Sequence, residues 1–178
     1  MKVGCLLKRL TAALIHDRGG ATAVEFALVA PPFLLLLFAI MEIGMVLVAS
    51  STLEDSVYDA GRIIRTGSLQ MSGNGIEVFE PLVCGGLYGL IACDDLVIDV
   101  RQFDTFGGVA LPDVFNEDGT VDEESLEFLP GGPEDIVVVR VYGVWHALTP
   151  GLKYIFGDAS TGGLKMTTAT VFRNEPYQ

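Results

Sequence analysis

A long apolar stretch near the N-terminus decides the fold: residues 26–48 read FALVAPPFLLLLFAIMEIGMVLV. Glu42 is the only charged residue among them. An α-helix needs about 20 residues to cross the hydrocarbon of a bilayer, and a buried helix of a soluble domain rarely runs this long without a polar face. The stretch therefore predicts a transmembrane helix.

The charges on the two sides of this helix differ in sign. Residues 1–20 carry a net charge of +3 and residues 49–178 a net charge of −13, within a total of −12. Basic residues before a span keep the N-terminus in the cytoplasm. The sequence thus predicts a single-pass protein of the inner (cytoplasmic) membrane with an acidic periplasmic domain. The negative charge argues against nucleic acid as a partner.

The chain divides into a basic leader (1–20), a transmembrane and assembly helix (21–50) and an extracytoplasmic domain (51–178). Helical periodicity continues to about Thr66, and Gly67 is a plausible stop. Apolar and β-branched runs predict strands, which we place at 76–83, 96–103, 136–142 and 164–172, and a short helix is expected near 122–128. The fold class expected is α+β, a long N-terminal helix followed by a small antiparallel sheet.

Two of the three cysteines, Cys84 and Cys93, lie in the predicted exported domain, and Cys5 lies in the leader. An even pair in an oxidising compartment predicts a disulfide, with two free buried thiols as the alternative. His16 and His146 are the only histidines and fall on opposite sides of the predicted membrane, so neither a metal site nor a cofactor is expected.

The acidic side chains of the domain have simple interpretations. Asp94, Asp95 and Asp99 are read as turn and strand-edge residues rather than an acid/base pair. Residues 116–124 depart from the calcium-loop pattern and are read as a solvated loop, with an irregular calcium site as the alternative. Because no catalytic motif stands out, we do not expect an enzyme.

One carboxylate has a more specific chemistry. Residues 18–29 read RGGATAVEFALV and place Glu25 at the edge of the apolar helix, where acidic residues are costly and are functional candidates. A cut after Gly20 would create an amino terminus at Ala21, one helical turn away. That amine, on the same or a neighbouring chain, could neutralise Glu25. The alternative is a carboxylate that snorkels to the membrane surface.

This segment, GGATAVEFAL at 19–28, resembles TadE-like pseudopilins of the Tad (Flp, type IVc) pilus system, as does IMEIG at 40–44. Weaker likeness continues at 60–62, at 99–101 and at the Cys84 and Cys93 pair. The resemblance implies cleavage between Gly20 and Ala21 by a prepilin peptidase and assembly roles for Glu25 and Phe26. For Glu42, a structural role and a pairing between helices both remain open.

The partners implied by the resemblance are the prepilin peptidase, other pilins and pseudopilins, and the inner-membrane assembly platform. About 130 residues follow the helix, which points to a minor pseudopilin rather than a short filament pilin. Two other interpretations remain. The chain could be an uncleaved, signal-anchored protein whose acidic domain binds a periplasmic partner or a cation, or a secreted protein cleaved near Ser50 by a conventional signal peptidase.

Overall fold

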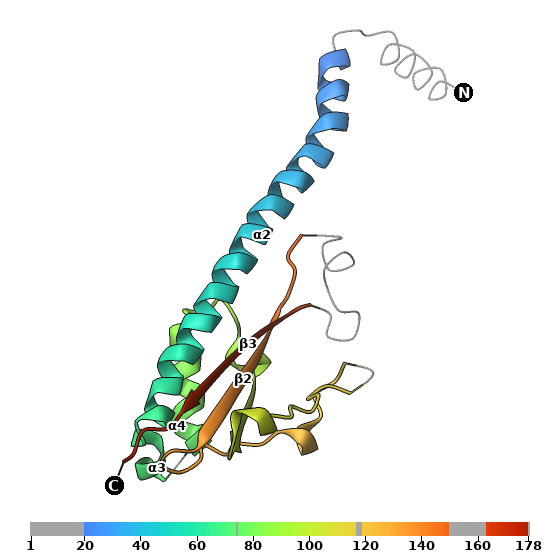
Figure 1. Ribbon diagram of the computed structural model, residues 1–178. Coiled ribbons are helices and arrows are strands. Elements are labelled where there is room, and N and C mark those ends of the chain that lie inside the picture. The colour runs from blue at the N-terminus through green and yellow to red at the C-terminus, as the bar shows by residue number, and fades with distance from the viewer. Residues whose placement is uncertain (1–19, 74, 117–118, 150–162, 178) are drawn as a thin grey trace, which may run out of the picture. The chain divides into compact units, whose positions relative to one another are not determined.

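The computed structural model describes residues 20–73, 75–116, 119–149 and 163–177. Among these residues, three α-helices come first: α2 (Ala21–Arg65), α3 (Ser68–Ser72) and α4 (Gly75–Gly86). Three strands follow: β1 (Val97–Phe103), β2 (Ile136–Trp145) and β3 (Leu164–Arg173). Single 3-10 turns occur at η2 (Cys93–Asp95), η3 (Phe106–Gly108) and η4 (Glu123–Ser125). The expected α+β class is confirmed (Figure 1).

The chain separates into two compact units, residues 1–40 and residues 41–178. In the first unit, the described residues form the N-terminal part of α2, and their large apolar side chains are exposed. Pro31 and Pro32 lie inside this helix, which is continuous across them. The second unit contains the rest of α2, the two shorter helices and the sheet.

The strands form one antiparallel sheet in the order β1-β2-β3. Val139 of β2 lies opposite Val100 of β1 and Thr170 of β3, which fixes the register. On the free side of β1, the Val100 N–H donates to the Glu127 carbonyl at 2.8 Å and the Leu129 N–H donates to the Val100 carbonyl at 2.8 Å. A short extended segment therefore continues the sheet beyond β1.

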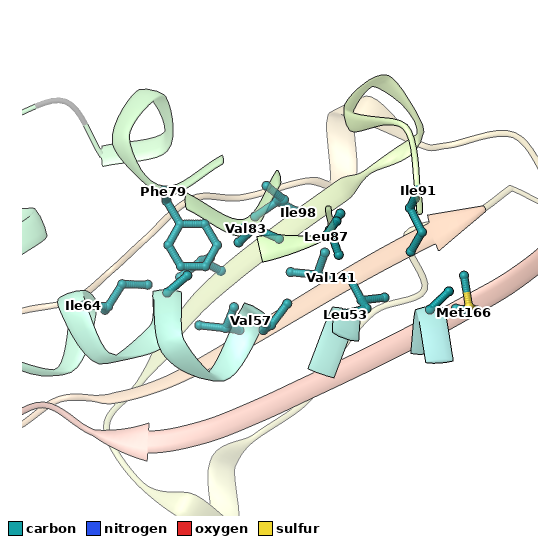
Figure 2. Packing of buried hydrophobic residues seen from close by; sticks show 14 of the residues in the cluster. Leu53, Val57, Ile64, Phe79, Val83, Leu87, Ile91, Ile98, Val141 and Met166 are labelled. Carbon is teal, nitrogen blue, oxygen red and sulfur yellow. The ribbon is translucent and has the colours of Figure 1, made fainter. Parts of the chain in front are cut away.

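The core lies between the helices and one face of this sheet. α2 contributes Leu53, Val57 and Ile64, spaced by three- and four-residue steps so that they share one face. β2 contributes Val137, Val139 and Val141, which alternate along the strand and so share one face. The opposite face is also buried there, at Val138 and Arg140. Figure 2 shows these groups meeting the side chains of α4 in one cluster.

The predicted strand at 76–83 is wrong, because this segment belongs to helix α4. Its buried residues Phe79 and Val83 are four residues apart, and they point into the core with Leu87, which directly follows the helix, in Figure 2. The apolar run was long enough for either structure, and only this helical period of burial separates the two. The short helix expected near 122–128 is reduced to the single turn η4.

The other boundaries agree with expectation. β1, β2 and β3 overlap the predicted strands at 96–103, 136–142 and 164–172. α2 ends at Arg65, and Gly67 follows with a φ of 77°, in the left-handed region that glycine adopts without cost. The Gly67 N–H donates to the Ile64 carbonyl at 3.0 Å. A side chain at Gly67 would collide with the Tyr177 ring, so two constraints favour glycine there.

Candidate functional site

The candidate site begins where α2 begins, at Ala21, directly after Gly20. Glu25 lies on the second turn of the helix and is exposed, and Phe26 beside it is 73% exposed. Within the described part of the chain, Glu25 forms neither a hydrogen bond nor an ion pair. The leader that the sequence predicts at 1–20 lies, apart from Gly20, outside the described residues. An unpaired carboxylate on an apolar helix is thus available to a group from elsewhere.

α2 is long and apolar enough to cross a membrane. In its most apolar 18-residue window, only 11% of the residues are buried within the protein. The large side chains from Val24 to Met41 are exposed on every side of the helix, including Phe33 at 59% and Leu36 at 58%. A core helix would bury one stripe, so this part of α2 has the surface of a membrane anchor.

Glu42 has the opposite environment and is only 3% exposed. Its Oε1 accepts hydrogen bonds from the Leu148 N–H at 2.6 Å and from the Trp145 Nε1–H at 3.3 Å. Its Oε2 accepts from the Thr149 N–H at 2.7 Å. These donors belong to the end of β2 and the residues after it. Of the two roles left open for Glu42, the structure supports the structural one, because the carboxylate ties α2 to its own domain.

Residues 20–62 match the family model of TadE-like proteins. The chain carries a TadE-like segment. This segment starts at Gly20, contains Glu25, Phe26 and Glu42, and ends within α2, so the match covers about a quarter of the chain. Such a segment indicates a protein associated with the Tad pilus. No curated protein and no solved structure shows significant similarity to the chain.

Beyond the TadE-like segment, the predicted disulfide is confirmed. Cys84, near the end of α4, is bonded to Cys93, the first residue of η2, with 5.5 Å between their Cα atoms. The alternative of two free thiols is wrong. The nine-residue separation closes a small loop that carries the buried Leu87 and Ile91 into the core.

Asp99 lies on β1, an edge strand of the sheet, as the sequence predicts, but its side chain is fully buried. Asp99 Oδ2 accepts hydrogen bonds from Arg140 Nη2 at 2.6 Å and Nε at 3.0 Å, and Oδ1 accepts from Arg101 Nε at 3.0 Å. The Glu127 N–H also donates to Oδ1, at 3.1 Å. Both oxygens of this carboxylate thus accept at least two hydrogen bonds each, and a buried charge needs such partners.

This cluster also fastens the long connection between β1 and β2 to the sheet. Arg140 Nη1 donates to the Pro112 carbonyl at 2.9 Å, and Arg101 Nη2 donates to the Ser125 carbonyl. Tyr142 lies beside it and packs edge-on against Phe115, with 5.0 Å between the ring centroids. Burial raises the pKa of the Tyr142 phenol, so it stays neutral at physiological pH.

No group of three or more His, Cys, Asp or Glu side chains that could hold a metal occurs among the described residues. Glu117 and Asp118 of the acidic loop lie outside them, so the irregular calcium site stays untested. His146 Nε2 lies 3.1 Å from Asp95 Oδ2, and both side chains are accessible to solvent. This pair is a polar surface contact, and Asp94 next to Asp95 belongs to the same exposed turn.

Proposed function

We propose that the chain is a minor pseudopilin of a Tad-type pilus or secretion machine, with a structural rather than a catalytic role. One observation carries the proposal: an apolar helix with an exposed surface starts at Ala21, next to Gly20, and carries Glu25, which has no partner among the described residues, within the TadE-like segment. This is the arrangement that a subunit needs in order to lie in a bilayer and then pack against similar helices.

Maturation supplies the missing partner of Glu25. A prepilin peptidase cuts the peptide bond between Gly20 and Ala21 and leaves a protonated amine on Ala21. Four residues of helix rise about 6 Å, so a small axial offset between two packed helices brings the amine of one chain to Glu25 of the next. Pairing removes an isolated charge from an apolar environment and sets the register of the subunits.

Phe26 contributes the apolar side of the same contact. It lies directly after Glu25 and is largely exposed, so it can pack against neighbouring helices once the subunit leaves the lipid. The partners in this proposal are the prepilin peptidase, other pilins and pseudopilins, and the assembly platform of the inner membrane. The basic leader keeps the N-terminus cytoplasmic, which places the acidic domain in the periplasm.

The proposal is tested by the N-terminus of the chain purified from cells with an intact Tad system. We expect sequencing or intact mass to give a start at Ala21, and the Gly20→Phe variant to keep its leader. Gly44→Ala is a matched control because a side chain at Gly44 would meet only open space. A mature chain that still begins at Met1 would overturn the proposal and favour the uncleaved, signal-anchored binding protein.

The role of Glu25 is tested separately. We expect Glu25→Ala to be cleaved like the unmodified chain but to be lost from the assembled machine, as measured by co-purification with the other pilins. Glu54→Ala removes an exposed carboxylate further along α2 and should co-purify normally. Equal recovery of both variants would remove Glu25 from the assembly contact.

A further inference from the structure

The apolar surface of α2 does not end where the domain begins. Past Glu42, the side chains Ile43, Met45, Leu47 and Val48 remain between 41% and 64% exposed. Ser50 and Ser51 follow, and the first exposed charges after Glu42 are Glu54 and Asp55. The apolar band on this side of the helix therefore overlaps, along the chain, the residues that contact the domain.

Helix length indicates why this band matters. If the hydrocarbon began after the charged Glu25 and ended at Met41, its 16 residues would supply about 24 Å of helix, short of the roughly 30 Å core of a bilayer. Extended to Val48, the same helix supplies about 35 Å and covers the core. The membrane then includes the level at which Glu42 holds the end of β2.

The domain presents suitable chemistry at this level. Leu148, whose N–H donates to Glu42, is 76% exposed and is the most exposed leucine of the domain's described residues. Trp145 also donates to Glu42 through its indole N–H, but its side chain is buried in the core of the domain. The paired His146 and Asp95 add a polar contact beside these apolar groups. The exposed Leu148 can therefore reach the hydrocarbon while the accessible His146 and Asp95 side chains stay among the headgroups.

We propose that the segment Trp145–Leu148 of the domain, which we call the rim, rests where the hydrocarbon meets the headgroups, on the domain's side of the bilayer. The inference rests on the proposed function only in requiring that α2 be inserted in a membrane. Continuity of the exposed apolar band with the membrane helix is what selects lipid as the occupant. Glu42 adds little cost to this position of the rim, because its carboxylate accepts hydrogen bonds from the same chain and is shielded from lipid.

Trp145 is the only tryptophan of the chain, so its fluorescence reports on the rim without any labelling. The full chain is reconstituted in phosphatidylcholine vesicles at a low protein-to-lipid ratio. The lipids carry bromine either near the headgroup, near the end of the acyl chain, or nowhere. We expect bromine near the headgroup to quench Trp145 emission most strongly, and deep bromine to quench it less.

Two variants separate the rim from the rest of the domain. Leu148→Asp should lose most of the shallow quenching while the chain stays resistant to carbonate extraction. Leu111→Asp, at another exposed leucine of the domain, should keep it. Emission that is equal in brominated and plain lipid while α2 is inserted would overturn this position of the rim but not the proposed function, as would chemical cross-links between copies through the rim. A chain extracted by carbonate would overturn both.

Discussion

The two parts of α2, before and after Met41, form one continuous helix, yet their side chains differ in burial. Before Met41, large side chains such as Phe26 and Leu36 are exposed all around the helix. From Glu42 onward, a stripe that includes Ala49, Leu53 and Val57 is buried against the domain. A buried stripe that repeats with the helical period indicates that a helix packs against its own domain. A helix without such a stripe has a surface suited to contact with lipid or with other subunits.

The difference in burial between the two parts of α2 is tested most directly by making the same substitution in each part. Leu53→Ala removes a side chain that is 1% exposed in the core, so we expect the free energy of unfolding to fall by about 2–5 kcal/mol. Leu36→Ala removes one that is 58% exposed and should change it by less than about 0.5 kcal/mol. Urea unfolding of the full chain in detergent, followed by Trp145 fluorescence, measures both. Similar losses would mean that the two parts do not differ as described.

Removing the disulfide tests whether the free energy of unfolding depends on the domain alone and not on the part of α2 before Met41. We expect the double variant Cys84→Ser, Cys93→Ser to lose about 2–3 kcal/mol of unfolding free energy. Without the crosslink, the unfolded chain gains conformational entropy. Reduction of the unmodified protein should give the same loss. Cys5→Ser, outside the domain, should give none. Membrane insertion of α2 should be unchanged in every case, and a loss of insertion would contradict the separation of the two parts.

The smallest expected effect concerns Glu42, at the point where α2 begins to contact the domain. Glu42→Ala leaves the Leu148 and Thr149 N–H groups without their acceptor, so we expect a loss of about 1–3 kcal/mol. Glu25→Ala, the matched carboxylate of the first part, should leave unfolding unchanged. Amide hydrogen exchange at Leu148 and Thr149 gives a local measurement, and it should accelerate only in the Glu42 variant. Unchanged protection there would show that Glu42 does not hold the segment.

Much of this fold follows from local patterns in the sequence. The β-branched run at 136–141 predicts β2, since such side chains suit a pleated sheet and serve a helix poorly. Gly67 predicts the end of α2, because few other residues adopt its left-handed backbone. The disulfide between Cys84 and Cys93 is predicted because these are the two cysteines of a domain expected in an oxidising compartment. In each case the decisive information lies within a few residues.

The remaining features depend on contacts that are distant in sequence. Nothing near Glu42 indicates that its hydrogen-bond donors lie more than 100 residues away, at Trp145, Leu148 and Thr149. Asp99 looks like an ordinary strand residue until Arg140 arrives opposite it on β2. The periodicity that defines α4 could have been found by comparing four-residue spacing with alternation before a strand was assigned at 76–83.

Because of where the three cysteines lie, the number of free thiols in a copy of the chain reports whether that copy has been exported and whether its leader has been removed. A copy whose domain never leaves the reducing cytoplasm keeps three reactive thiols. An exported copy with its leader attached keeps one, at Cys5, because Cys84 and Cys93 are bonded to each other. A copy cut after Gly20 keeps none. Alkylation of whole cells with a heavy maleimide would resolve these populations as separate bands on one gel, with no fusion or tag on the protein.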